Sequence, residues 1–173
     1  MSGLLLLGVI GIWVVIVIFT VRWLAHRLKP SAVNIIFVVM VTVVMLVLPV
    51  ADELISAPQF YKLCEEGTKL KFDPEKIRGR TIFFAKNLQP DISIGLLHGY
   101  YIPWRLLDTT TKEELISYNS YYVNGGILIR TLQISATNAP LTMRSYCSAH
   151  EHPEQPSFLK RYDLKYVDRK EIK

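Results

Sequence analysis

The sequence predicts an α+β protein in which a hairpin of two transmembrane helices precedes a small antiparallel β-rich domain with one or two short helices. Two runs without a charged residue, 1–21 and 31–51, predict the hairpin, because a ~30 Å hydrocarbon core needs about 20 apolar residues in a helix. We place these helices at about 3–24 and 32–50. Residues 52–173 form the expected domain, since they have a polar composition with short alternating stretches that are typical of half-buried strands.

The connection between the two runs carries the basic residues Arg22, Arg27 and Lys29 and no acidic residue. Short loops rich in Lys and Arg stay in the cytoplasm. The connection is therefore expected to be cytoplasmic, with both termini and the domain on the far side of the membrane. A bacterial inner membrane with a periplasmic domain is the simplest setting, and a eukaryotic endomembrane is the alternative. Asp52 and Glu53 mark the predicted outer end of the second helix.

A cleaved signal peptide is the main alternative to the hairpin. The first run has no basic segment before it and is longer than the apolar region of a signal peptide. The second run follows basic residues, but Pro49-Val50-Ala51 is a poor match to the small-x-small cleavage pattern. We therefore expect an uncleaved two-pass protein bound to the lipid bilayer.

The formal net charge of +5 is divided unevenly along the chain. The connection contributes +3, whereas the domain carries all 15 acidic residues and 17 basic ones. Nucleic-acid binding needs a clustered basic face. The nearly even charge of the domain therefore argues against a nucleic-acid partner.

The only two cysteines, Cys64 and Cys147, lie in the domain assigned to the periplasm. Disulfides persist in that oxidising compartment. A bond between them would close a loop of about 80 residues, which the chain-entropy model values at roughly 4–5 kcal/mol. Two buried free thiols are the alternative, but the even number of cysteines and the compartment favour a disulfide.

The domain is expected to begin with a juxtamembrane helix over Pro58–Glu66, because Phe60, Leu63 and Cys64 share one helix face. Ile127–Ser135 suits a short helix, although its alternation suits a strand nearly as well. Alternating or β-rich composition predicts strands at 70–73, 80–85, 92–97, 99–107, 115–122, 141–147 and 162–167.

Turn residues separate these elements. Pro74–Gly79 and Ser148–Ser157 read as loops, Thr109–Glu113 as the polar connection of a hairpin, and Asn124–Gly126 as a break. Pro103 lies inside a predicted strand, which indicates an edge strand or a bulge, because proline cannot donate a ladder hydrogen bond.

The densest group of possible metal ligands is Cys147 with His150, Glu151 and His152. Nitrogen, oxygen and sulfur ligands suit zinc, but these residues are crowded rather than spaced as in zinc frameworks, and Cys147 is expected in the disulfide. A solvated loop is the favoured interpretation, and His98 is expected to be a structural histidine rather than a general base. The sequence has no nucleophile elbow, zincin, Walker or Rossmann motif, so neither catalysis nor a cofactor is predicted.

All nine tyrosines lie after Val50, and two pairs are adjacent, Tyr100-Tyr101 and Tyr121-Tyr122. Adjacent residues of a strand point to opposite faces, so each pair sends one ring inward and one outward. The outward rings could form an interaction surface, because tyrosine often anchors interfaces. Ordinary packing within a small sheet is the favoured alternative.

The first run also contains Trp13, Gly8 and Gly11. Trp13 lies in the middle of the predicted span and is expected to face lipid or a neighbouring helix. The two glycines are one turn apart and could allow a close helix contact, although they lack the GxxxG spacing.

The chain resembles a group of uncharacterised bacterial two-pass inner-membrane proteins with a C-terminal periplasmic domain. The likeness covers most of Ala51–Cys147 and fades in the tail. It implies the compartment and paired cysteines, Cys64 and Cys147, but no activity. The residues that carry it are Ala51-Asp52-Glu53-Leu54-Ile55, Gln59-Phe60, Leu63-Cys64, Gly79-Arg80-Thr81-Ile82, Pro103-Trp104-Arg105, Ile116-Ser117-Tyr118-Asn119, Gly125-Gly126, Ile129-Arg130, Ile134-Ser135 and Pro140-Leu141-Thr142.

Two classes of function are compatible with this sequence. The leading hypothesis is a non-enzymatic accessory or interaction protein that presents its periplasmic domain to a protein partner or a second copy, as a subunit of an inner-membrane complex or as an immunity or phage-exclusion protein. The second is a membrane-tethered metal-dependent hydrolase that uses His98, His150, Glu151 and His152. Transport ranks lowest, because neither span contains a charged residue that could line a polar pathway.

Overall fold

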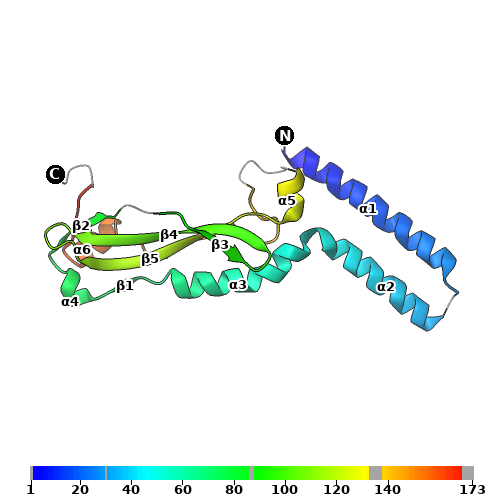
Figure 1. Ribbon diagram of the computed structural model, residues 1–173, viewed down its shortest axis with the longest axis horizontal. Helices are drawn as coiled ribbons and strands as arrows, with labels where there is room; N and C mark the ends of the chain where they lie inside the picture. Colours follow the sequence, from blue (N-terminus) through cyan, green and yellow to red (C-terminus); the bar gives the residue numbers. More distant parts are fainter. Residues whose placement is uncertain (1, 30, 86–87, 133–137, 169–173) are drawn as a thin grey trace.

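In a computed structural model that describes residues 2–29, 31–85, 88–132 and 138–168, a helical hairpin and an elongated α+β domain lie end to end (Figure 1). The hairpin consists of α1 (Ser2–Arg27) and α2 (Ala32–Val47). A 3₁₀ turn, η1 (Leu48–Val50), leads directly into α3 (Ala51–Gly67). The α+β class and the two long apolar N-terminal helices are thus confirmed.

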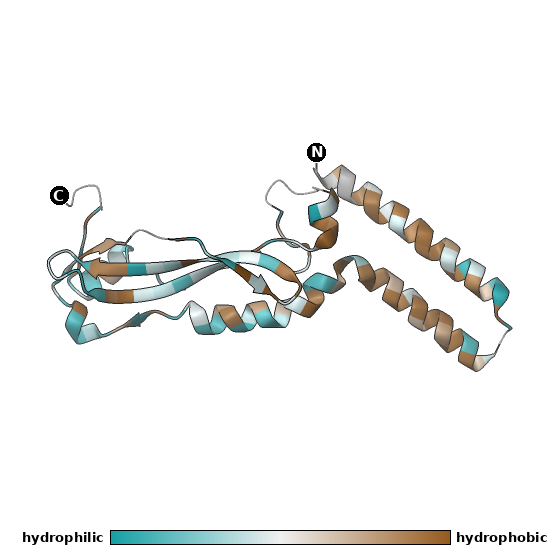
Figure 2. Ribbon diagram, in the orientation of Figure 1, coloured by the Kyte–Doolittle hydropathy of each residue, from teal (hydrophilic) through white to brown (hydrophobic). Residues whose placement is uncertain are grey.

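Both hairpin helices expose apolar side chains over most of their surface (Figure 2). Their most apolar windows have mean hydropathies of 2.3 and 2.8, with 6% and 0% of the residues buried. By length and composition, residues Leu7–Arg27 of α1 and the continuous helical run Ala32–Gly67, which comprises α2, η1 and α3, can each cross a membrane. The indole Nε1 of Trp13 donates to the carbonyl of Met45 at 2.9 Å, so Trp13 contacts the neighbouring helix. Gly8 and Gly11 have open space where a Cβ would lie and do not create a close helix contact.

The juxtamembrane helix begins earlier than predicted. α3 starts at Ala51 rather than at Pro58, and it contains Pro58 in its interior. Proline removes the hydrogen bond to the carbonyl four residues earlier, that of Leu54. Both residues lie on the exposed side of α3, where the carbonyl can bond to solvent, so the helix continues through the proline.

The domain is built on one sheet in the order β1-β5-β4-β2-β7, with β3 also paired to β4 and β6 to β5. Five of the six strand pairings are antiparallel, as predicted, but β7 pairs with β2 in parallel, so the sheet is mixed rather than wholly antiparallel. The strands are β1 (Lys71–Phe72), β2 (Thr81–Phe84), β3 (Asp91–Ile94), β4 (Leu97–Asp108), β5 (Glu114–Val123), β6 (Tyr146–Cys147) and β7 (Lys165–Tyr166).

The long β4–β5 hairpin forms the backbone of the domain, as predicted, with residues 109–113 as its connection. Pro103 lies in β4, and β4 is a central strand between β5 and β2. The prediction that Pro103 marks an edge strand is therefore wrong for β4 as a whole. Its register with β3 ends at Tyr100 and that with β2 begins at Leu106. Pro103 therefore occupies a stretch where β4 is paired in register only with β5, opposite Asn119. On the other side of β4 no strand is in register with this stretch, so the N–H group that proline lacks is not needed there for a ladder hydrogen bond.

The domain has more short helices than the one or two expected. Both predicted loops contain one, α4 (Pro74–Ile77) and α6 (Pro156–Arg161), besides the expected α5 (Ile127–Leu132). In α4, the Asp73 side chain accepts from the backbone of Glu75 and Pro74 occupies the first turn, which is a helix start rather than a loop signal. The predicted helical residues 133–135 lie outside the described residues, and only residues 146–147 of the predicted strand 141–147 are a strand.

Two separate cores pack on opposite faces of the sheet. Near the hairpin, Phe60 of α3 packs with Leu97 and Tyr121 on one face. At the far end, Phe158 of α6 packs with Leu106 on the other face. α3 and α6 therefore cover opposite faces at opposite ends, and within the described residues no helix covers the half-face of β4 and β5 opposite α3 (Figure 1).

Candidate interaction surface

A stack of three tyrosines crosses the uncovered half-face. The strand register places Tyr100, Tyr122 and Tyr146 directly opposite one another on β4, β5 and β6. The Tyr100 and Tyr122 rings lie 4.8 Å apart and 7° from parallel, and the Tyr122 and Tyr146 rings lie 5.9 Å apart at 19°. We call these three residues the tyrosine ladder. The neighbouring residues Tyr101 and Tyr121 stack on the opposite face, beneath α3, so the predicted split of each adjacent pair is confirmed.

The tyrosine ladder is accessible. The Tyr146 side chain is 59% exposed, while Tyr100 and Tyr122 are half-buried. Burial, together with the hydroxyls of Tyr100 and Tyr146, raises the pKa of Tyr122, which keeps its phenol neutral as a donor and acceptor. A hollow of about 340 Å³ beside Tyr100 is bordered by exposed side chains of Asp91 and His98.

Polar contacts continue the same face toward the far end of the sheet. Trp104 donates to the Ser120 hydroxyl at 2.8 Å, and that hydroxyl lies 2.7 Å from the Ser148 hydroxyl. The Tyr118 hydroxyl lies 3.3 Å from Nδ1 of His152. Burial, with contributions from neighbouring groups, raises the pKa of Tyr118 well above its ordinary value, so this hydroxyl stays protonated.

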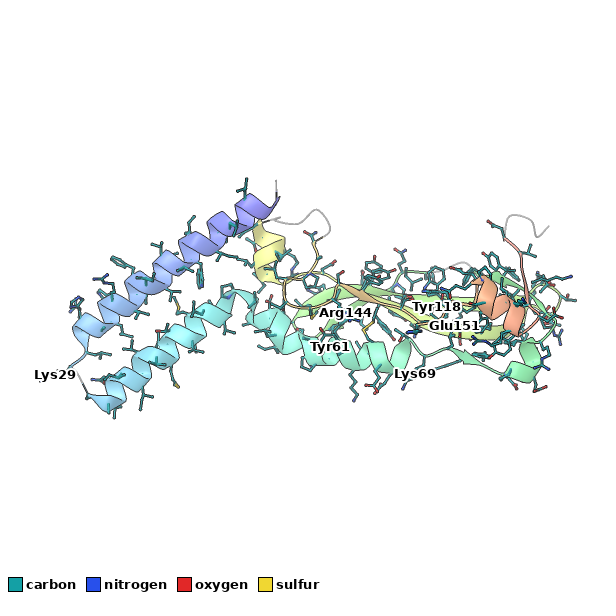
Figure 3. The ribbon with its side chains drawn as sticks, turned by 180° about the vertical axis from the view of Figure 1, so that it is seen from behind. Lys29, Tyr61, Lys69, Tyr118, Arg144 and Glu151 are labelled. Carbon is teal, nitrogen blue, oxygen red and sulfur yellow. A yellow bond between two sulfur atoms is a disulfide. The ribbon has the colours of Figure 1, made fainter. Side chains whose placement is uncertain are left out.

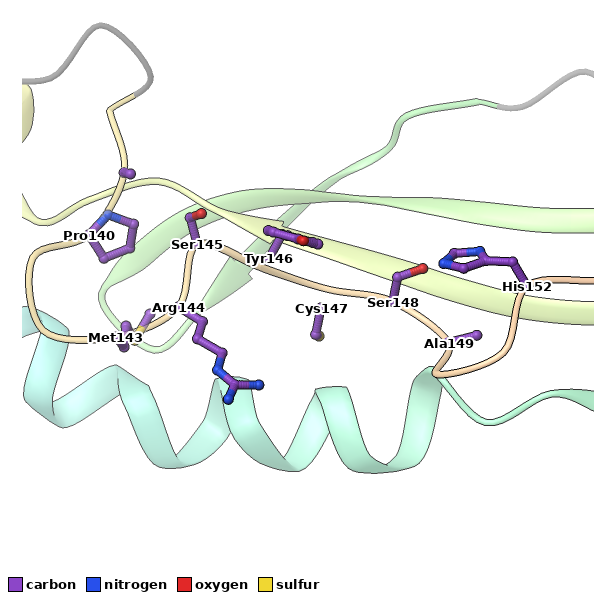
Figure 4. Close-up of a pocket in the computed structure, with 10 residues that line it drawn as sticks. Pro140, Met143, Arg144, Ser145, Tyr146, Cys147, Ser148, Ala149 and His152 are labelled. Carbon is purple, nitrogen blue, oxygen red and sulfur yellow. The ribbon is translucent and has the colours of Figure 1, made fainter. Parts of the chain in front are cut away.

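A groove of about 690 Å³ runs along residues 139–152, next to β6 (Figure 4). Pro140 and Arg144 line one part of it, and Ser148 and His152 line the other. The groove and the tyrosine ladder share Tyr146, so they form one continuous surface.

The disulfide between Cys64 and Cys147 is confirmed, with the two Cα atoms 5.8 Å apart. It joins α3 to β6, the strand that contributes Tyr146 to the ladder. β6 has only two residues. The covalent bond therefore holds this short edge strand against α3, the helix that follows the hairpin.

The possible metal ligands do not gather into one site. The described residues contain no group of three or more ligating side chains close enough to hold a metal ion. Cys147 is in the disulfide, Glu151 pairs with Arg161 at 3.1 Å, and His152 contacts Tyr118. His150 is exposed, in agreement with the solvated-loop interpretation.

The structure also reveals a buried acidic site that the sequence did not predict. Glu53 is 1% exposed. Its Oε1 accepts from the backbone N–H of Gly126 at 3.0 Å, and its Oε2 accepts from the backbone N–H of Leu141, the backbone N–H of Thr142 and the Thr142 hydroxyl at 2.8–2.9 Å. One carboxylate thus joins α3 to two distant segments of the chain.

Asp52 completes this acidic site. It is 8% exposed, and its Oδ2 accepts from the backbone N–H of Ile127 at 2.6 Å, at the first turn of α5. A Cβ at position 126 would collide with the Asp52 carboxylate, so Gly126 is required there. Asp52 and Glu53, which the sequence places at the outer end of the second apolar run, therefore both face the protein interior. The Gly125-Gly126 break was the one sequence signal of this contact, since glycine permits the close approach.

The predicted basic loop is mostly helical: α1 continues to Arg27, so Arg22 and Arg27 lie in its last two turns and only Lys29 lies in the connection. All three are exposed toward the end of the hairpin farthest from the domain. Figure 3 labels Lys29 at this closed end. The guanidinium of Arg27 lies 5.6 Å from the centre of the Trp23 ring, which is 55% exposed. The positive charge and the domain are thus separated by the full length of the hairpin.

Comparison with known proteins adds no relative to this geometry. No family model, no curated protein and no solved structure matches the chain. The resemblance to two-pass inner-membrane proteins therefore stays a prediction.

Proposed function

We propose that this is a non-enzymatic accessory protein that is anchored in the bacterial inner membrane and presents its periplasmic domain to a protein partner. The observation that carries the proposal is the tyrosine ladder on a sheet face that no helix covers. The apolar hairpin, the basic closed end and the disulfide support the membrane anchor, with both termini and the domain in the periplasm.

The ladder suits protein recognition for a physical reason. A tyrosine offers a large amphipathic surface and has few rotatable bonds, so ordering it in a complex costs little entropy. The stacking of Tyr122 between Tyr100 and Tyr146 reduces that cost further, because the rings are already held in the free protein. Exposed polar groups beside the ladder can form the rim that surrounds such anchors in interfaces.

The geometry gives less support to the hydrolase hypothesis. That hypothesis needs His98 to meet His150, Glu151 and His152. His152 contacts Tyr118, which is opposite Trp104, six residues along β4 from His98. Six residues of strand span about 20 Å, so these groups do not converge on one substrate. An immunity or phage-exclusion protein would use the same surface and differ only in the partner it recognises.

Removing the ladder should release the partner. We expect wild-type protein purified in mild detergent to retain a stoichiometric partner or a second copy, and Tyr100→Ala/Tyr146→Ala to lower that affinity at least about 30-fold, the equivalent of about 2 kcal/mol for interface anchors. Native mass spectrometry with affinity titration measures both. Tyr61→Ala, which removes a ring that is 48% exposed on α3, is the matched control and should retain the partner.

Two results would contradict the proposal. One is a clean monomer of the wild type in native mass spectrometry. The other is full partner recovery by the ladder variant when its disulfide and melting temperature match those of the wild type.

A further inference from the structure

We infer that the end of the domain next to the hairpin is itself seated in lipid, so that the membrane-embedded surface extends past Ala51 to include α5 and the β3–β4 turn. This inference rests on the proposed membrane anchor. The surface concerned, which we call the apolar collar, consists of the exposed side chains of Leu54, Ile55, Leu96, Ile127, Leu132 and Leu141.

The acidic side chains next to the apolar collar, those of Asp52 and Glu53, are buried, whereas the apolar side chains of the collar are exposed. Asp52 and Glu53 are the first charged residues after the second apolar run, yet their carboxylates accept hydrogen bonds from backbone N–H groups inside the protein. Acidic side chains at membrane depth face the protein interior and find partners there. At this level the molecule therefore presents leucine and isoleucine outward, and the apolar surface of the hairpin runs on into the domain (Figure 2).

The length of α1 supports the same boundary. A ~30 Å core measured up the helix from Arg22, the first charge of the connection, needs about 20 residues and so reaches the first turn of α1. Trp13 contacts Met45 and sets the relative level of the two helices. Ten residues above Trp13 lies Gly3, about 15 Å farther along α1. Ten residues above Met45 lies Ile55, but the chain bends at η1 between α2 and α3, so Ile55 lies at most about 15 Å above Met45 along the hairpin axis (Figure 1). The level of Ile55 is thus within the apolar span of α1.

α5 is amphipathic and lies beside the N-terminal end of α1 (Figure 1). Ile129 is buried in the domain, whereas Ile127 is 63% exposed. Two apolar grooves, of about 330 and 550 Å³, separate α5 from α1 and η1, and Leu128 and Trp13 line both. Water in these grooves would find few polar partners. Acyl chains are the occupant that the collar fits, because the grooves open onto the same apolar surface that surrounds the hairpin.

Site-directed spin labelling can test this inference on the full chain. The native cysteines are paired, so one added cysteine can be labelled without reduction. We would label Leu96→Cys and Ile127→Cys in vesicles of phosphatidylcholine and phosphatidylglycerol, and measure collisions with oxygen, which enters lipid, and with a water-soluble nickel chelate. Leu88→Cys is the matched control, because Leu88 is 73% exposed but lies before β3, away from the hairpin. Val39→Cys on α2 reports the membrane anchor by itself.

We expect labels at positions 96, 127 and 39 to collide with oxygen and to lose collisions with the nickel chelate, while position 88 keeps them. If position 39 is lipid-exposed but 96 and 127 are water-exposed, the collar inference is overturned and the anchor stands. If 96 and 127 are shielded from both reagents, protein rather than lipid covers the collar, which also overturns the inference. Water exposure at position 39 would overturn the anchor and the collar together.

Discussion

Replacing Glu53 with alanine is expected to unfold the part of the domain that joins the hairpin. The change leaves the backbone N–H groups of Gly126, Leu141 and Thr142 without their acceptor. The Gly126 donor is buried and the Leu141 and Thr142 donors are partly buried. A buried donor that loses its partner costs about 1–3 kcal/mol, so we expect a loss of about that size from Gly126 and smaller losses from the other two. A small domain has about 5–15 kcal/mol of stability in total, and this single substitution removes a substantial part of it.

Chemical denaturation in detergent, followed by intrinsic tryptophan fluorescence, measures this effect, because Trp13 lies beside α5 at the junction and Trp104 in the core at the far end of the sheet. Glu53→Gln keeps the shape of the side chain and one acceptor oxygen, so it should fall between the wild type and Glu53→Ala. Glu66→Gln, an exposed change in the last turn of α3, controls for loss of a negative charge and should unfold like the wild type. Equal midpoints for Glu53→Ala and the wild type would show that the buried carboxylate does not hold the junction.

Replacing both cysteines with serine should also destabilise the domain. The Cys64–Cys147 bond spans 83 residues, and closing a loop of that size stabilises a protein by roughly 4–5 kcal/mol in the chain-entropy model. We expect Cys64→Ser/Cys147→Ser to lower the denaturation midpoint. The position of Tyr146 in the tyrosine ladder should also become less well fixed, because only the two-residue pairing of β6 with β5 then holds β6 in place.

Expression in a strain that lacks periplasmic disulfide oxidation should reproduce the loss in the wild-type chain, and the double variant should be insensitive to that strain. Non-reducing peptide mapping shows directly whether the bond is present. Free alkylation of both wild-type thiols without reductant would contradict this prediction.

The success of sequence reasoning followed the strength of the local pattern. The long β4–β5 hairpin and the two apolar helices were predictable because each has many residues with one period or one composition. The short strands β1, β2, β3 and β7 overlap predicted strands, but the short helices α4 and α6 were missed, because each begins with a proline in its first turn, which resembles a loop signal. The parallel pairing of β7 with β2 was not predictable either, since it depends on tertiary packing.

The interaction surface was predictable only in part. Alternation was enough to split Tyr100 from Tyr101 and Tyr121 from Tyr122. It could not show that Tyr146 extends the ladder, since that depends on the pairing of β6 with β5. The acidic site was missed because a charged pair after an apolar run resembles a solvated boundary, and the donors that satisfy Glu53 come from residues 73–89 positions away in the chain.

The central claim is that the apolar hairpin crosses the membrane and leaves its basic closed end inside and the domain outside. Labelling of added cysteines in intact spheroplasts by a membrane-impermeant maleimide tests it most directly, because the paired native cysteines give a blank background. His26→Cys probes the closed end without changing its three basic residues, and Ser157→Cys probes an exposed position of the domain. We expect Ser157→Cys to be labelled at once and His26→Cys to be labelled only after the membrane is permeabilised. Labelling of His26→Cys in intact spheroplasts, or protection of Ser157→Cys there, would contradict it.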